Sequence, residues 1–126
     1  MKVSIIGQGY VGLTLAVTAA KSGFEVVGFD INKDLIEDLK AGKSNVEGVS
    51  STDLQTTNYQ PSSEPSSING SDIVVIAVPT PLDENRKPDL LFLSAACQII
   101  GDNLTNKALV RSEEHTSELQ SRVDIS

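Results

Sequence analysis

The sequence has a single cysteine, no apolar run long enough to cross a membrane, and fewer basic than acidic residues among its 126 positions. One cysteine excludes an internal disulfide framework, which agrees with a reducing compartment. Spanning a bilayer takes about 20 consecutive apolar residues, so no transmembrane helix is expected. The net charge of −7 leaves no basic stripe for nucleic acid or for an anionic membrane surface. We therefore expect at most one globular domain, with no nucleic acid and no membrane among its partners.

The apolar N-terminus has features that secretory signal peptides share, since Lys2 precedes an apolar run that ends in small residues at Ala20. Three spaced glycines interrupt that run, and the periodic pattern continues without a break after Ala20. Both features favour a folded domain over a cleaved leader, and we expect the protein to be cytoplasmic.

The C-terminal segment 111–126, RSEEHTSELQSRVDIS, has no apolar period of either kind. Most of it corresponds, codon by codon, to the translation of a commonly used sequencing adapter. We interpret 111–126 as a non-native tail, so that the natural sequence is expected to end near Val110. On this interpretation Glu113, Glu114 and His115 are no metal site, and no metal is expected elsewhere.

The strongest motif is a glycine-rich turn between a strand pattern and a helix pattern. The short apolar run KVSII precedes Gly7, Gly9 and Gly12, and apolar residues then recur at helical spacing. A second strand pattern, FEVVGF, leads to Asp30, about twenty residues beyond the middle glycine. A lone G-x-G-x-x-G is weak, but this order of strand, turn, helix, strand and acid is the dinucleotide-binding fingerprint.

Each position of the fingerprint has its own physical reason. Gly7 permits the tight turn, Gly9 lets the backbone approach a pyrophosphate, and Gly12 lets the helix pack close to its strand. The phosphates then meet the unpaired N–H groups at the helix N-terminus. Asp30 would accept hydrogen bonds from the adenosine ribose and repel a 2′-phosphate, which selects NAD over NADP. The alternative is a plain glycine turn in which Asp30 only caps the next helix.

Further elements follow along the chain. INKDLIEDLKAGK at 31–43 predicts a second helix that stops at Gly42. The segment from Ser44 to Ser67 is rich in Ser, Thr, Asn and Pro and predicts a linker, with LQTT at 54–57 as a short edge strand inside it.

The second half of the chain holds one more strand pattern and one more helix pattern. SDIVVIAV at 71–78 predicts a strand buried on both faces, and ALV at 108–110 predicts the start of a fifth strand. Asp89 is expected to cap a helix between them. That helix has one apolar face, which includes Cys97, so this cysteine is predicted to be a core residue and not a catalytic one. The face consists of Leu90, Leu93, Cys97, Ile100 and Leu104.

Together these elements predict an α/β fold, a Rossmann-type doubly wound parallel sheet ordered 3-2-1-4-5 and incomplete after the start of strand 5. Strands 1 and 4 flank the crevice where the order reverses, and ligands bind outside their carboxyl ends. Pro79-Thr80-Pro81 lies at that edge. The prolines hold the loop extended, so that Thr80 is expected to point its hydroxyl at the nicotinamide side of the cofactor. Alternatively, the prolines only end the strand.

Four segments carry a more specific resemblance: IIGQGYVGL, GFDIN, GKSNVEGVSSTDL and VIAVPTPLDENRKPDL. Together they resemble the N-terminal domain of the UDP-glucose/GDP-mannose dehydrogenase family, over residues 1–110. The Pro-Thr-Pro segment that ends in KPDL is most similar to the UDP-N-acetylglucosamine and UDP-N-acetylmannosamine 6-dehydrogenases. The resemblance implies a partial NAD-binding domain at 1–110 of an enzyme that oxidises the C6 alcohol of a UDP-sugar. The family carries this oxidation through an aldehyde and a cysteine thioester to a carboxylate, with two NAD.

The resemblance also implies particular site residues. It places cofactor contacts on Val11, Asp30 and Thr80. Family members often carry Lys or Arg five residues after the acid, where this chain has Leu35, so Lys33 becomes a candidate to hold the adenosine end. The full set of candidates is Gly7, Gly9, Tyr10, Val11, Gly12, Asp30, Lys33 and Thr80.

The catalytic part of the family lies elsewhere. The nucleophilic cysteine, the residues that assist it and the sugar-nucleotide domain belong to the part of the family beyond the position of Val110. The resemblance therefore implies no catalytic residue in this chain, an inactive fragment, and a parent enzyme that is a homo-oligomer and meets its UDP-sugar through the missing part.

Two other functions remain open at this point. An NAD-dependent dehydrogenase of hydroxyacid or hydroxyacyl type would share the fingerprint, but it gives no reason for VPTP followed by PDL. A regulatory NAD-binding module, such as those of potassium-transport proteins, is a complete single domain of about this size.

Overall fold

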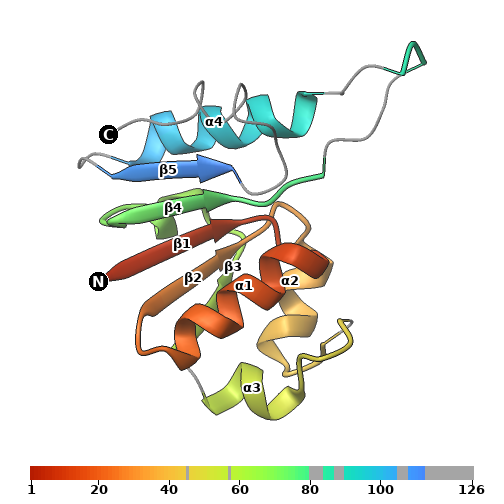
Figure 1. Cartoon of the computed structure of the whole chain (residues 1–126), viewed down its shortest axis with the longest axis vertical. Helices are drawn as coiled ribbons and strands as arrows, with labels where there is room; N and C mark the ends of the chain where they lie inside the picture. The colour runs from red at the N-terminus through yellow and green to blue at the C-terminus, as the bar shows by residue number, and fades with distance from the viewer. Residues whose placement is uncertain (45, 57, 80–83, 87–89, 105–107, 113–126) are drawn as a thin grey trace.

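The computed structural model describes residues 1–44, 46–56, 58–79, 84–86, 90–104 and 108–112. In these parts of the chain, parallel strands form one sheet in the order β3-β2-β1-β4-β5 (Figure 1). The predicted α/β class and strand order are therefore confirmed. The strands are β1 Lys2–Ile6, β2 Glu25–Phe29, β3 Tyr59–Ser62, β4 Ile73–Ile76 and β5 Leu109–Ser112. The helices are α1 Tyr10–Lys21, α2 Lys33–Lys40, α3 Ser51–Thr56 and α4 Leu91–Asn103, with a 3-10 turn, η1, at Pro65–Ile68.

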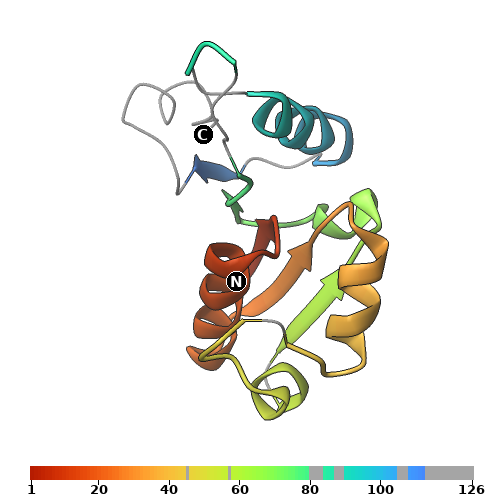
Figure 2. The ribbon, with the colours of Figure 1, turned by 90° about the vertical axis from the view of Figure 1, so that its right-hand side faces the viewer.

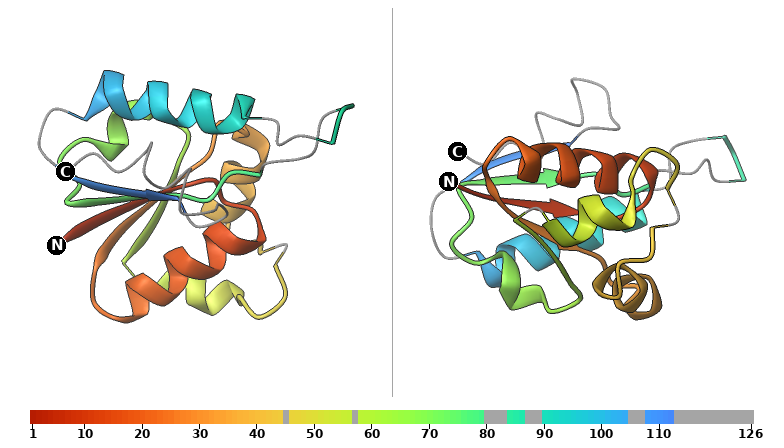
Figure 3. Two further views of the ribbon diagram at one scale, coloured as in Figure 1. Left: turned by 45° about the horizontal axis from the view of Figure 1, so that its top comes forward. Right: turned by 90° about the horizontal axis from the view of Figure 1, so that it is seen from below.

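Helices cover both faces of the sheet, as expected for a doubly wound fold (Figure 3). One core lies where α1, α2 and α3 pack on the face that carries Val3 and Ile5. The other lies where α4 and η1 pack on the face that carries Ile6 and Phe29. Figure 2 shows α1, α2 and α3 around β2 and β3, and α4 near β5. Two apolar layers therefore enclose the sheet and leave the carboxyl ends of its strands as the edge where a site can form.

Strand β4 is fully buried on one face only. Val74 and Ile76 have no exposed surface and belong to the α4 side. On the other face Ile73 and Val75 are half-buried and pack against the margin of the first core. Burial on both faces was predicted, and this prediction is wrong for the α1 side, because α1 packs mainly on β1 and β2.

The segment predicted as a linker is structured. LQTT, expected as an edge strand, lies for the most part in α3, and the third strand comes after it as β3. The main-chain N–H of Asp53 donates to Ser50 Oγ at 3.1 Å, and the N–H of Ser50 donates to Asp53 Oδ2 at 3.1 Å. This reciprocal pair caps the first turn of α3 and favours a helix over a strand. Pro61 is accommodated in β3 because β3 is at the edge of the sheet.

Local signals explain the ends of the other helices. The side chain of Asn32 accepts from the N–H of Leu35 at 3.1 Å and caps α2, and the chain leaves this helix through Gly42 with φ +80. Helix α4 starts after Leu90, which makes no side-chain cap, and the expected cap Asp89 lies outside the described residues. Among the helices that are described, none has the length and apolar character needed to cross a membrane.

Candidate cofactor-binding site

The glycine turn joins β1 to α1 at the carboxyl edge of the sheet. Gly7 has φ +98, and a Cβ there would lie 2.7 Å from the carbonyl oxygen of Ala77. A Cβ on Gly12 would collide with the carbonyl oxygen of Gly7. Both glycines are therefore required by the fold itself, Gly7 for its left-handed backbone and Gly12 for the close approach of α1 to the turn.

Gly9 differs from these two glycines. Its backbone is extended, with φ −75 and ψ −157, and a Cβ built on it would meet no protein atom within 4 Å. Nothing in the described residues therefore requires a glycine at this position. A side chain at Gly9 would fill the space in front of the N-terminus of α1. That space suits a ligand whose phosphates approach the backbone.

The N-terminus of α1 faces the same space. Gly9 is the N-cap and makes no side-chain cap hydrogen bond, while its carbonyl oxygen accepts from the N–H of Leu13 at 2.9 Å. The first N–H groups of a helix have no partner within the helix, and the helix dipole favours negative charge there. Tyr10 and Val11, which follow Gly9, line the space and expose much of their side chains. A pyrophosphate fits this position.

The carboxylate of Asp30 stands at the end of β2 and faces the turn. Its Oδ2 accepts from the main-chain N–H of Gln8 at 2.8 Å, and its Oδ1 accepts from the N–H of Asn32 at 2.9 Å. The cap of α2 is Asn32, so the alternative of Asp30 as a plain helix cap is wrong. Each carboxylate oxygen has a further lone pair to offer, and Asp30 is only partly buried, so it can also accept ribose hydroxyls.

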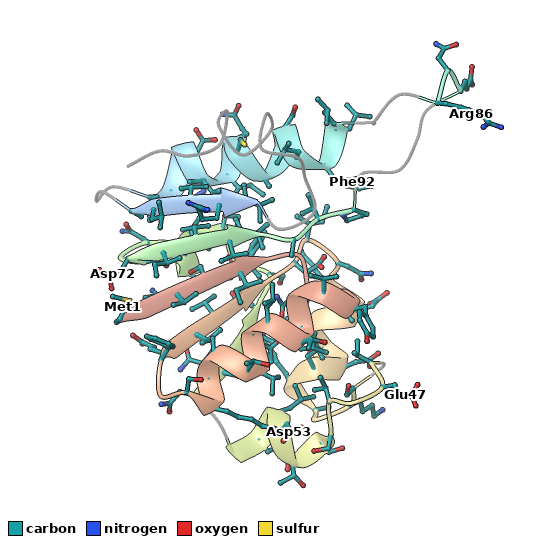
Figure 4. The ribbon with its side chains drawn as sticks, viewed as in Figure 1. Met1, Glu47, Asp53, Asp72, Arg86 and Phe92 are labelled. Atoms are coloured by element: carbon teal, nitrogen blue, oxygen red, sulfur yellow. The ribbon has the colours of Figure 1, made fainter. Side chains whose placement is uncertain are left out.

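A cavity of about 510 Å³ connects these features. This volume is within the roughly 300–1,000 Å³ typical of small-molecule and cofactor sites. Its walls come from the ends of β1, β2 and β4, the first turn of α1, and one side of α4. Figure 4 shows Phe92 on α4, at the end of the helix near the carboxyl ends of the strands. The apolar part of the wall is made by Ile6, Phe29, Ile31, Leu35, Ala77, Val78, Pro79, Phe92, Ala95, Ala96 and Ile99.

The structure brings most of the predicted site residues together. Gly7, Gly9, Tyr10, Val11 and Asp30 line the cavity, and Gly12 lies directly behind the turn.

The remaining two predicted residues differ from this group. Lys33 is exposed at the start of α2 and does not line the cavity, whereas Leu35 does, so the cavity wall is apolar at this point. Thr80 lies outside the described residues, although Pro79 before it is part of the wall. The roles of Lys33 and Thr80 stay predictions.

Three residues of the site were not predicted from the sequence. Gln8 and Tyr59 form a buried polar pair under the turn, and no local pattern pairs residues so far apart in the sequence. Phe92, together with Ala95, Ala96 and Ile99, forms a second apolar stripe on α4 that faces the cavity. The helical spacing of this stripe was a signal in the sequence.

Cys97 is partly buried against the second core, in keeping with the predicted role in packing. Burial raises the pKa of its thiol, which keeps it protonated and poorly nucleophilic near neutral pH. Neither its position nor its environment is that of a reactive cysteine.

The chain matches known proteins over most of its length. The model of the UDP-glucose/GDP-mannose dehydrogenase family, NAD binding domain, matches residues 1–125. A UDP-N-acetyl-D-glucosamine 6-dehydrogenase of Salmonella typhi is 39% identical over 111 residues, which cover 87% of this chain and 26% of that protein. Protein CapL of Staphylococcus aureus is 38% identical over 108 residues, 86% of this chain and 25% of its own length. The chain thus spans about a quarter of these curated relatives.

Solved structures agree with this match. The UDP-D-ManNAc dehydrogenase of Pyrococcus horikoshii superposes with a TM-score of 0.85 at 29% identity, over 97% of this chain and 31% of that one. The fingerprint, the carboxylate at the end of β2 and the cavity between them are the parts that such a domain needs. The chain belongs to the UDP-glucose/GDP-mannose dehydrogenase family, within its NAD-binding domain.

Proposed function

We propose that this chain is the NAD-binding domain of a UDP-sugar 6-dehydrogenase, which oxidises the C6 alcohol of the sugar to a carboxylate with two NAD. Gly9 carries the proposal. It lines the cavity at the helix N-terminus, and no contact inside the described protein explains why it is a glycine. A pyrophosphate lying against the backbone gives that explanation.

The described residues bind and orient the cofactor. The N-terminus of α1 holds the pyrophosphate, Asp30 holds the adenosine ribose, and the apolar wall around Phe92 and Leu35 excludes water from the bound molecule. Thr80 is proposed to contact the nicotinamide side, and Lys33 the adenosine end from the surface. When bound, NAD supplies the hydride acceptor for the oxidation of the sugar.

We assign the substrate to the UDP-N-acetylhexosamines in preference to UDP-glucose. The segment VPTPLDENRKPDL and the names of two relatives, the 6-dehydrogenases of Salmonella typhi and Pseudomonas aeruginosa, support this choice. The UDP-sugar would bind to the part of the enzyme that lies outside this chain. We further propose that the enzyme works in the cytoplasm and is a homo-oligomer.

Replacing Gly9 by alanine tests the cofactor site. We expect Gly9→Ala to weaken NAD binding by at least about tenfold, since a methyl group in the pyrophosphate space costs more than about 1.4 kcal/mol. The unfolding free energy should not fall by a comparable amount, because the new Cβ meets no protein atom within 4 Å. Binding is measured by NMR titration of the labelled chain, and stability by urea unfolding. An unchanged dissociation constant would remove the main support for the proposal.

The substrate assignment is tested by following NADH absorbance with UDP-N-acetylglucosamine and UDP-glucose in turn. The 126-residue chain alone is expected to reduce no NAD with either sugar, because binding a cofactor by itself stabilises no transition state. A longer enzyme that contains this domain is expected to react faster with UDP-N-acetylglucosamine. Faster reaction with UDP-glucose would move the enzyme to the other branch of the family.

A further inference from the structure

A buried polar pair lies directly under the glycine turn. Gln8 occupies the first variable position of the fingerprint and exposes 1% of its surface, and Tyr59, at the start of β3, exposes 5%. The hydroxyl of Tyr59 donates to Gln8 Oε1 at 2.6 Å. Burial raises the pKa of Tyr59 well above its ordinary value, and the nearby carboxylate of Asp30 adds a smaller increase. The phenol therefore stays neutral and acts as a hydrogen-bond donor.

The amide end of Gln8 reaches back to the turn. Its Nε2 donates to the carbonyl oxygens of Ile5 at 3.1 Å and of Gly7 at 2.9 Å. Two carbonyl acceptors on one side and a hydroxyl donor on the other leave only one orientation of the amide that satisfies every group. The side chain of Gln8 is therefore fixed at both of its polar atoms.

One peptide group of the turn is consequently held from two sides. The carbonyl of Gly7 is bound by the side chain of Gln8, and the N–H of the same peptide donates to the carboxylate of Asp30 at 2.8 Å. Rotation of this peptide would break both hydrogen bonds. The orientation of the turn and the position of Asp30 are thus coupled through Gln8.

The sheet leaves room for this arrangement at Gly28. A Cβ at Gly28 would collide with Gln8 Oε1 and would lie 2.5 Å from Cε1 of Tyr59. Gly28 has no positive φ, so its glycine is explained by this contact and not by its backbone. Three residues, from the glycine turn, β2 and β3, thus build one buried unit under the cofactor site.

We propose that Gln8 and Tyr59 are positioning residues for NAD, which hold the Gly7–Gln8 peptide and the Asp30 carboxylate in the geometry that binds the pyrophosphate and the ribose. The inference rests on the proposed function. Neither side chain lines the cavity at Asp30, so both act through the turn and the carboxylate that they hold. Pre-organisation of this kind lowers the cost of ordering the site when the cofactor binds.

Tyr59→Phe is the first test, because it removes one hydroxyl and keeps the ring. We expect the dissociation constant for NAD to rise by about three- to tenfold, the range of one lost hydrogen bond. Because Asp30 is also less well held, the preference for NAD over NADP should narrow. Both constants are measured by NMR titration of the 126-residue chain at a temperature where its amide spectrum shows it folded.

Ser4→Ala is the matched control. It removes a buried hydroxyl of β1 that bonds to Ser71 Oγ at 2.5 Å, away from the cavity. It should lower stability and leave both dissociation constants unchanged. A purely structural role for Tyr59 would give the same pattern as Ser4→Ala.

The double variant Gln8→Met with Tyr59→Phe separates folding from positioning. Tyr59→Phe leaves Gln8 Oε1 buried without its donor, whereas the double variant removes this donor and acceptor together. The double variant also removes the amide that donates to the carbonyls of Ile5 and Gly7, so urea unfolding is measured beside binding. It should still bind NAD more weakly and with a narrowed preference over NADP.

The outcomes are distinct. NAD and NADP constants equal to those of the wild type in either variant would overturn the inference and leave the proposed function standing. A failure of both variants to fold would make the pair a folding determinant and also overturn it. A wild-type chain without NAD binding would overturn the proposed function, and the inference with it.

Discussion

Gly12→Ala is expected to lower the unfolding free energy by about 1 to 3 kcal/mol, the usual cost of an overpacked site. A Cβ at this position collides with the carbonyl oxygen of Gly7, which is backbone and has little freedom to move. Because Gln8 Nε2 donates to the same carbonyl, any shift of Gly7 also disturbs the held peptide. NAD binding should therefore weaken together with stability. Urea unfolding followed by circular dichroism and an NAD titration measure the two effects.

Gly101→Ala is the control for this substitution. Gly101 is exposed within α4, its φ is not positive, and a Cβ there meets no atom within 4 Å. An alanine at such a site reduces the freedom of the unfolded chain and stabilises by about 0.4 to 1 kcal/mol. The two glycine-to-alanine changes are thus expected to have opposite signs. A Gly12→Ala chain as stable as the wild type would show that α1 does not approach the turn as closely as described.

Asp30→Ala is expected to weaken NAD binding by about 1.5 to 3 kcal/mol, the range of a lost hydrogen bond to a charged group. This corresponds to a dissociation constant about 10- to 150-fold larger. The loss has two parts, because the carboxylate is expected to bind the ribose and also accepts from the N–H of Gln8 in the turn. The preference for NAD over NADP should narrow, since the charge that repels a 2′-phosphate is gone. Calorimetric titration with both cofactors measures these effects.

Two further variants show whether the charge of Asp30 causes the change in cofactor preference. Asp34→Ala removes an equal charge from an exposed position on α2 and should leave the preference between the cofactors unchanged. Asp30→Asn keeps an acceptor oxygen for the turn but not the charge, so it should narrow the preference with a smaller loss of stability. If Asp30→Ala binds NAD as tightly as the wild type, Asp30 only supports the turn and does not contact the ribose.

Much of this protein was predictable from short-range patterns. The fingerprint glycines, the acid at the end of the second strand and the strand order follow from local periodicity and from the connection rules of parallel sheets. The prediction of a linker and an edge strand for the α3 segment is wrong, because its Ser and Thr content indicates a loop. The signal for the helix is the three-residue spacing of Ser50 and Asp53, which form the capping pair.

The sequence by itself determined which residues form the glycine turn and that Asp30 follows β2, because both depend on spacing along a single βαβ unit. Only the tertiary structure decided which glycines the fold needs. A Cβ at Gly12 would meet a carbonyl of the turn, a Cβ at Gly28 would meet side chains from the turn and from β3, and a Cβ at Gly9 would meet no atom within 4 Å. Likewise, the bond between Gln8 and Tyr59 joins residues 51 positions apart, which are brought together by the parallel pairing of β1, β2 and β3. Contacts of this kind depend on the register in which the strands pair, and no local pattern in the sequence encodes that register.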